Sequence, residues 1–310
     1  MRQNDKRKKK LGVLIKSNSS YLLMAAPAMI ALIMLVYVPM FGLVLAFKDY
    51  SYRDGIWGSE WNGLDNFKYI FGSGDIAITI RNTILYHVFF TASVMVVALA
   101  LAILLYFVKS KKAADKYQLF STLPYLTTYN IIAYIVFIFL KADGGLLNNL
   151  IERAGGTGIA WYTEPAYWPL IFVILQIWFG AGMKAVYYYS AFMAIDESIL
   201  EAAAIDGAKW HHKIFKIMLP SIAPTICIFL IMDMGKVLTT NFTFFYSIPM
   251  DSSALYRVTD VLATYEYRGL MSGNIGTTAA LGLFTGVVQV VTTLSLNHIV
   301  KKFDSENAMF

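Results

Sequence analysis

The sequence is poor in charge and nearly devoid of cysteine. Only 15% of its 310 residues are charged, whereas about 25% is usual in soluble domains, and 57% are hydrophobic. The single cysteine, Cys227, can form neither a disulfide within the chain nor a cysteine-based zinc site. The four histidines are not spaced like metal ligands, and no metal site is predicted. With a mean hydropathy of +0.55, the composition predicts an integral membrane protein.

Several signatures of other function classes are also missing. No segment has the GxxxxGK[ST] spacing of a P-loop, so the chain is not expected to bind or hydrolyse ATP itself. A membrane-embedded enzyme needs a nucleophile and base, or metal ligands, at membrane depth, and His87 alone supplies neither. A self-contained secondary transporter would show an internal repeat and intramembrane charge relays. No repeat is found, and the sequence therefore favours a non-enzymatic subunit, with the secondary transporter kept as an alternative.

Six apolar runs are long enough to cross a bilayer as helices. The first is too long for a signal peptide, and it follows a basic arm at residues 1–20. Residues 21–310 are therefore predicted to form one all-α transmembrane domain of six helices. The predicted spans are residues 22–47, 82–108, 119–140, 167–194, 219–238 and 277–300.

The distribution of positive charge orients these spans. With the N-terminus in the cytoplasm, the inner segments hold 16 Lys and Arg residues and the outer loops hold seven. This asymmetry satisfies the positive-inside rule. It predicts that both termini and the loop at residues 195–220 are cytoplasmic, and that residues 241–276 form an outer loop.

The polar loop at residues 195–220 has a helical pattern of its own. Helix-forming residues at 201–204 lead to Asp206-Gly207, a helix-stop signal because glycine accepts a positive φ. Apolar residues then recur at helical spacing before the next span. The pattern predicts two short helices joined at Gly207. On these residues alone, an amphipathic segment that rests on lipid headgroups stays an open alternative.

The same loop resembles the EAA loop of ABC-importer permeases. Glu201-Ala202-Ala203 is followed by Gly207 and then by Ile217-Met218-Leu219-Pro220. In that family the loop is the coupling helix that seats in a cleft of the cytoplasmic ATPase. The resemblance implies two P-loop ATPase subunits that bind ATP and Mg, with no cofactor on this chain. The implied contact residues are Glu201, Ala202, Ala203, Asp206, Gly207, Lys209, Leu219 and Pro220.

Further motifs resemble the LplB-like branch of carbohydrate permeases. They are Tyr37-Val38-Pro39-Met40, Phe47-Lys48-Asp49-Tyr50, Gly58-Ser59-Glu60-Trp61, Gly63, Asn66-Phe67, Arg81-Asn82-Thr83, Leu123-Pro124-Tyr125-Leu126 and Tyr267-Arg268-Gly269-Leu270. This resemblance implies a MalF-type (type I) importer fold in a bacterial cell membrane. The chain departs from the pattern at residues 241–245, Asn-Phe-Thr-Phe-Phe, where a Gly-Phe followed by an acidic residue and Gln is expected.

Ionisable and aromatic residues suggest where a solute would pass. Asp233 and Lys236 lie inside the fifth span on one helix face, where they can pair with each other. They are predicted either to line the pathway or to hold the helix to a partner subunit. Lys184 is expected to extend towards the inner headgroups. Aromatic faces suit sugar rings, although lipid-interface belts explain most exposed tyrosines. The candidate pathway residues are Asp233, Lys236, Asn241, Phe242, Phe244, Tyr246, Tyr125, Tyr129 and Asn130.

Together these resemblances imply one permease subunit of a binding-protein-dependent ABC importer. The implied substrate is a sugar, in particular an oligosaccharide, carried by alternating access that partner ATPases drive. A peptide or other polar solute is the alternative, because the EAA loop does not report the substrate. The implied partners are a second, related permease chain, two ATPase subunits and an extracellular binding protein.

Overall fold

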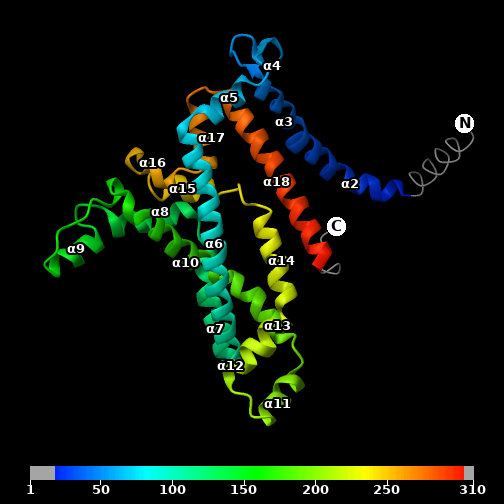
Figure 1. Ribbon diagram of the computed structural model, residues 1–310, viewed down its shortest axis with the longest axis vertical. Coiled ribbons are helices and arrows are strands. Elements are labelled where there is room, and N and C mark those ends of the chain that lie inside the picture. The colour runs from blue at the N-terminus through cyan, green and yellow to red at the C-terminus, as the bar shows by residue number, and fades with distance from the viewer. Residues whose placement is uncertain (1–17, 304–310) are drawn as a thin grey trace, which may run out of the picture. The chain divides into compact units, whose positions relative to one another are not determined.

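The computed structural model describes residues 18–303, so most of the predicted basic arm lies outside the described residues. The chain forms two compact units, which are considered separately (Figure 1). One contains the described residues up to Tyr69 together with Asn274–Leu283. The other contains Ile70–Gly273 and the described residues from Phe284 to Phe303. Both are helical apart from one short hairpin, which confirms the predicted all-α class.

The first unit begins with a long apolar helical run that changes its helix type along its length. Pro27 lies inside the first α-helical part and Pro39 lies in the first turn of the second, short one. Each proline removes an intrahelical hydrogen bond, because it has no backbone N–H. The run is assigned as α2 (Ser19–Leu32), a π-helix (Ile33–Tyr37), α3 (Val38–Met40) and a 3₁₀-helix (Phe41–Phe47). Side chains from Tyr21 to Phe41 are largely exposed, as expected of a surface that faces lipid or another helix.

A small hairpin closes this unit, and it explains several of the branch motifs. Strands β1 (Lys48–Asp49) and β2 (Glu60–Trp61) pair antiparallel around α4 (Gly55–Gly58). The buried Lys48 ammonium donates to the carbonyls of Ile56 (2.9 Å) and Trp57 (3.1 Å). Asn66, in α5 (Asp65–Gly72), donates to the Ala46 and Lys48 carbonyls. These motif residues therefore satisfy the backbone of a loop that has few ladder hydrogen bonds of its own.

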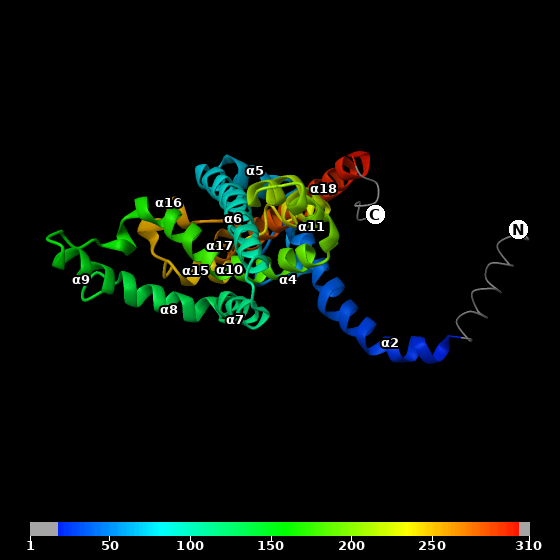
Figure 2. The ribbon, with the colours of Figure 1, turned by 90° about the horizontal axis from the view of Figure 1, so that it is seen from below.

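Two long helices, α6 (Gly74–Tyr106) and α10 (Trp168–Met193), pack against each other and form the centre of the second unit (Figures 1 and 2). Small side chains make the close packing possible, since Ala98 and Ala102 of α6 and Ala181 and Ala185 of α10 are all buried. Gly182 of α10 lies against the backbone of α7 at Ser121, where a side-chain Cβ would collide with the Ser121 carbonyl. This contact brings α7 close to α10.

Between the two long helices the chain bends sharply and forms a lobe. The axis of α7 (Lys111–Thr122) with its 3₁₀ extension (Leu123–Leu126) lies at 92° to α8 (Tyr129–Leu140). The lobe that follows contains α9 (Leu146–Arg153) and 3₁₀ turns at Trp161–Thr163 and Pro165–Tyr167. Asn148 is buried in it and makes four hydrogen bonds, to Ala142, Ile159 and Trp161. One asparagine thus organises the loop.

The rest of the second unit carries the polar loop and two further helical regions. After α10 come α11 (Glu197–Ile205), α12 (Trp210–His212), a π-helix (Lys213–Met218), α13 (Leu219–Ser221) and α14 (Ala223–Met234), which bears the exposed Cys227. The two arms of the fifth apolar segment meet at 59°. Next are α15 (Phe242–Ser247), a 3₁₀ turn (Ser253–Leu255), α16 (Tyr256–Thr259), α17 (Leu262–Met271) and α18 (Ile275–Phe303). Residues 241–276, predicted as a loop, are therefore mostly helical.

A polar cluster ties α16 and α17 to the beginning of α6. The Arg268 guanidinium forms an ion pair with Asp260 and lies 3.5 Å from an Asp251 carboxylate oxygen. Asn82 of α6 donates to the Asp260 carbonyl (3.0 Å), and the Leu262 amide donates to the Thr83 hydroxyl (3.0 Å). Two of the branch motifs, far apart in sequence, thus meet in one cluster. We call Asn82, Asp251, Asp260 and Arg268 the α6–α17 latch.

Within residues 18–303, four helices are long and apolar enough to cross a membrane, and six segments qualify if each bent pair forms one span. The unbroken helices are Ser19–Phe47, Gly74–Tyr106, Pro165–Met193 and Ile275–His298. The bent pairs are Lys111–Leu126 with Tyr129–Leu140, and Trp210–Ser221 with Ala223–Met234. The six predicted spans fall on these six segments. The breaks, at residues 127–128 and at Ile222, lie close to Pro124 and Pro224, which have no backbone N–H to donate within a helix.

Candidate functional site: a central pocket and a coupling loop

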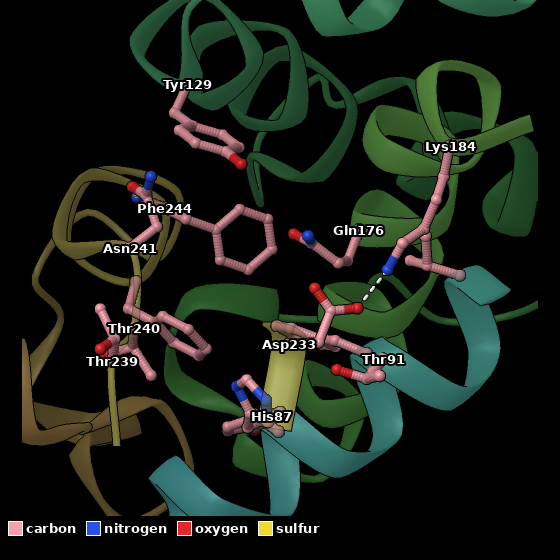
Figure 3. Close-up of a pocket in the computed structure, with 14 residues that line it drawn as sticks. His87, Thr91, Tyr129, Gln176, Lys184, Asp233, Thr239, Thr240, Asn241 and Phe244 are labelled. Carbon is pink, nitrogen blue, oxygen red and sulfur yellow. Dashed lines mark hydrogen bonds and ion pairs between the residues drawn. The ribbon is translucent and has the colours of Figure 1, made fainter. Parts of the chain in front are cut away.

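A pocket of about 210 Å³ lies in the second unit, where five helical regions meet (Figure 3). His87 and Thr91 come from α6, Tyr129 from α8, and Gln176 and Lys184 from α10. Asp233 comes from α14, and Phe244 from α15. The remaining lining residues are Tyr86, Phe90, Val94, Thr239, Thr240, Asn241 and Phe245. The lining combines aromatic rings with polar and charged side chains, as in pockets that hold a ligand of mixed polarity.

The charged part of the lining is an ion pair between two membrane helices. The Lys184 ammonium of α10 donates to the Asp233 carboxylate of α14, and both side chains are less than one-third exposed. The predicted pairing of Asp233 with Lys236 is therefore wrong, and so is the expectation that Lys184 extends to the headgroups. Helix α14 ends at Met234, so Lys236 no longer follows the helical spacing that would place it beside Asp233. Its side chain is exposed and outside the pocket lining.

Two polar atoms of the lining are buried and have no hydrogen-bond partner. They are Nε2 of His87 and the hydroxyl oxygen of Thr240. A buried polar atom without a partner costs about 1–3 kcal/mol, so such atoms are rare unless water or a ligand satisfies them. Both atoms belong to residues that line the pocket. The wall of the pocket thus contains two polar atoms that this chain leaves without a partner.

The aromatic part of the lining is a cluster of packed rings. Phe90 and Phe245 stack with centroids 6.0 Å apart, and Phe244 meets Tyr129 edge-on at 5.4 Å. Asn241 caps α15 by accepting from the Phe244 amide at 3.0 Å, which fixes the start of the helix that bears these rings. The segment that departs from the branch pattern, residues 241–245, therefore contributes two of the aromatic rings of the pocket, Phe244 and Phe245.

The structure brings together only part of the predicted pathway set. Asp233, Asn241, Phe244 and Tyr129 line the pocket. The others lie outside its lining: Lys236 is exposed, Phe242 and Tyr246 stack on each other, Tyr125 packs on Phe179, and Asn130 accepts from Ser247. Whether any of these residues touches a solute stays a prediction.

Sequence reasoning missed Lys184, His87, Thr91, Gln176, Thr239 and Thr240 as pocket residues. Lys184 carried a usable signal, because a lysine deep in an apolar run usually faces a cavity or a counter-ion. Thr91, Thr239 and Thr240 carried none, since threonine is common in membrane helices and in the turns between them.

At the other end of α6, residues 195–220, which the resemblance predicts to be the coupling loop, begin with a well-capped helix. The Asp196 carboxylate accepts from the Ser198 amide at 3.0 Å, at the N-cap of α11. The hydrogen bonds to Ser198 lower the pKa of the Asp196 carboxyl, because they favour its ionised form. The helix start is therefore fixed just after α10 ends.

Gly207 ends α11 in the way the sequence predicts. Its φ is +76°, and the Ala208 and Gly207 amides donate to the Ala203 and Ala204 carbonyls, which together form a Schellman motif. The prediction of two short helices joined at Gly207 is confirmed, although the second helix is largely a π-helix. Single-turn π-helices cost stability and occur often at functional sites.

Three buried residues hold the coupling loop against the long helices, and its other side is open. Leu200, Ile214 and Met218 pack in one cluster with Ala98, Ala102 and Phe192. Ile205 (88% exposed), Trp210 (68%) and Phe215 (67%) face outward. Of the implied contact residues, Ala203 and Leu219 are half-buried, and Glu201, Ala202, Asp206, Gly207, Lys209 and Pro220 are exposed. Exposed apolar side chains beside charges are typical of a protein interface.

Comparison with known proteins agrees with this arrangement. Residues 117–305 match the family described as binding-protein-dependent transport system inner membrane component. The matched segment contains the coupling loop and most of the pocket lining. The chain belongs to this family. It is a multi-pass membrane permease and not an enzyme.

Relatives of this permease resemble it over nearly the whole chain. Protein LplB of Bacillus subtilis is 32% identical, over 94% of this chain and 92% of its own. The polygalacturonan/rhamnogalacturonan transport system permease protein YteP of the same organism is 32% identical, over 98% and 94%. These matches confirm the resemblance to the LplB-like branch.

The fold agrees with a solved importer. A chain of a bacterial alginate ABC transporter, in complex with a pentasaccharide-bound periplasmic protein, superposes with a TM-score of 0.84 at 29% identity. The match covers 93% of this permease and 96% of that chain. The type I ABC importer permease fold is thereby confirmed.

Proposed function

We propose that this permease carries an oligosaccharide across a bacterial cell membrane through the central pocket. The observation that supports this most directly is the lining itself, which combines aromatic rings with polar and charged side chains. Sugar rings present apolar C–H faces and hydroxyl edges, so they match such a surface. Relatives that are named for polygalacturonan and alginate transport point to the same class of solute.

The pocket volume suggests how an oligosaccharide would pass. At about 210 Å³ it is smaller than the about 300–1,000 Å³ of pockets for drug-sized ligands. It would therefore accept one sugar residue of a chain at a time. An oligosaccharide would occupy it successively, with the rest of the chain on either side.

The energy would come from partner subunits that dock on the coupling loop. The exposed Ile205, Trp210 and Phe215 give an ATPase an apolar surface, and Glu201 and Asp206 give it acceptors for basic groups. Two such subunits would bind ATP and Mg. A second, related permease and an extracellular binding protein would complete the importer. In this orientation both termini and residues 195–220 are cytoplasmic.

The test is purification of a tagged copy from its native membrane, followed by reconstitution with whatever accompanies it. We expect a P-loop ATPase and a second permease of similar size. Liposomes that contain the assembly and its binding protein should take up labelled oligosaccharide only with ATP inside. Recovery of the chain alone, active on an ion gradient, would contradict the proposal and favour a secondary transporter. ATP-driven uptake of a peptide but no saccharide would keep the importer and replace its substrate.

A further inference from the structure

The Lys184–Asp233 ion pair is an unusual feature to retain between two membrane helices. Removing two charges from water costs several kcal/mol each, and a well-packed apolar pair of similar volume is often as stable or more stable. The surrounding parts of α10 and α14 are apolar and could supply such a pair. Stability alone therefore gives no reason for these two residues, and their position on the pocket surface suggests another role.

The surroundings of the pair favour an anionic ligand group. Among the lining residues of the pocket, Lys184 is the only lysine or arginine and Asp233 the only acidic residue. His87 lies next to Asp233, within hydrogen-bonding reach of its backbone, and its Nε2 has no partner. A ligand carboxylate could thus take the place of the Asp233 carboxylate on Lys184. A neutral hydroxyl could not, because it brings no counter-charge and would leave the Lys184 ammonium as an uncompensated charge.

We propose that Lys184 is the residue of this permease that selects saccharides with a carboxylate, and that Asp233 is its counter-ion when the pocket is empty. A uronate carboxylate accepts from the Lys184 ammonium, while its ring lies against Phe244 and Phe245. Asp233, released from Lys184, accepts from sugar hydroxyls. The proposal rests on the proposed function, because it needs a saccharide in the central pocket. It adds the chemical group of the substrate that the pocket recognises, the carboxylate, and the residue that recognises it, Lys184.

An internal counter-ion also explains how the substrate would leave again. A lysine without a partner in this pocket would hold a carboxylate tightly and slow its release. Asp233 competes for the same ammonium, so the free energy gained on binding is only the difference between two similar ion pairs. Transport sites need such moderate affinity, because a solute must leave the site as well as enter it.

The experiment measures binding to the permease without the preference of the binding protein. Trigalacturonate is titrated onto the purified importer complex, without its binding protein, and followed by saturation-transfer NMR, which detects weak binding. The carboxyl-reduced, neutral trisaccharide is the second probe. The variants are Lys184→Gln, Asp233→Asn and the exchanged pair Lys184→Asp/Asp233→Lys. Lys236→Gln is the matched control, because it removes a lysine from the segment after α14 but outside the pocket lining.

We expect Lys184→Gln to raise the Kd for trigalacturonate about tenfold or more, since a charge-assisted hydrogen bond is lost. Asp233→Asn should lower that Kd, because the competitor for Lys184 is gone. The exchanged pair should bind trigalacturonate as weakly as Lys184→Gln does. The neutral trisaccharide should show the same Kd in wild type and Lys184→Gln, and Lys236→Gln should match wild type with both probes.

A structural ion pair predicts a different pattern, and that pattern would overturn the proposal. In that case both single variants weaken binding of both probes equally, and the exchanged pair restores it. Absence of trigalacturonate binding to wild type would also overturn it. The proposed function is judged separately by ATP-driven uptake with the binding protein present. If wild type imports a saccharide while the Kd values do not follow the expected pattern, only the role of Lys184 fails.

Discussion

Gly182 lies where α10 crosses α7, and replacing it with alanine should lower stability far more than the addition of one methyl group usually does. A Cβ at this position would collide with the Ser121 carbonyl oxygen and lie 3.1 Å from the Thr122 amide nitrogen. Both neighbours are backbone atoms, so neither can turn away as a flexible side chain would. The two helices would have to separate by roughly 1.5 Å to reach even a tight contact, and overpacking of this kind costs about 1–3 kcal/mol.

Gly180 provides a matched control on the same helix. An added Cβ there would meet Val94 at 3.5 Å, an ordinary van der Waals contact. Both substitutions raise helix propensity by the same amount, about 1 kcal/mol, so the difference between them isolates the collision. We expect Gly180→Ala to be neutral or stabilising and Gly182→Ala to be destabilising.

The assay is thermal unfolding of the detergent-solubilised complex, followed by size-exclusion chromatography of the fraction that remains assembled. At about 2–4 °C per kcal/mol, Gly182→Ala should lose several degrees in half-unfolding temperature relative to Gly180→Ala. Because α7 leads into the segment that bears Tyr129, uptake should fall as well. Equal thermal stability of the two variants would refute the claim that the α7–α10 crossing depends on the absence of a side chain at Gly182.

Three further predictions concern the coupling loop and the latch. Gly207→Pro should lower the amount of solute transported per ATP hydrolysed without removing the protein from the membrane, because proline cannot adopt the positive φ of the Schellman motif. Glu201→Lys should have the same effect. Normal uptake in both variants would refute the coupling role. Asp196→Ala should destabilise α11 while Asp196→Asn should not, as measured by proteolysis of the loop. Since the Asp196 pKa is lowered in the fold, its stabilising effect should be present at neutral pH and fade as the pH falls through that lowered pKa, and a loop equally resistant at all pH values in wild type would contradict this. Arg268→Gln should lower the free energy of unfolding by about 1–3 kcal/mol, because it leaves the Asp260 carboxylate without its ion-pair partner. Adding Asp260→Asn should recover part of that loss. If the effects of the two substitutions are simply additive, the two residues do not interact.

Much of the fold could be predicted from the sequence, because membrane helices follow from apolar length alone. The helix stop at Gly207 was equally readable, since few residues other than glycine end a helix with a positive φ. The helices within residues 241–276 were missed, because short helices between polar turns carry no long apolar run. Their stability depends on tertiary contacts such as the Arg268–Asp260 ion pair, which joins residues eight apart.

The pocket was only half predictable for a related reason. Asp233 and Phe244 were found because a charge in a membrane helix and a group of aromatic residues are conspicuous in the sequence. The partner of Asp233 was assigned by helical spacing to Lys236, but α14 ends after Met234 and that spacing no longer applies. Lys184 lies 49 residues away in sequence and meets Asp233 only through the packing of α10 against α14. No pattern within one segment could reveal that contact.

The length of α6 has a mechanical consequence. Its 33 residues form one continuous helix of about 50 Å, without an internal proline. It joins the latch at Asn82, the pocket at His87 and Thr91, and the coupling loop near Tyr106. Asn82 lies 24 residues from Tyr106, about 36 Å along the helix axis at ~1.5 Å per residue, so a tilt of about 5° at the coupling end would displace the latch end by about 3 Å. A small rotation imposed on residues 195–220 would therefore be magnified where α6 meets α17, and the latch is the part of the molecule that must either follow that displacement or give way.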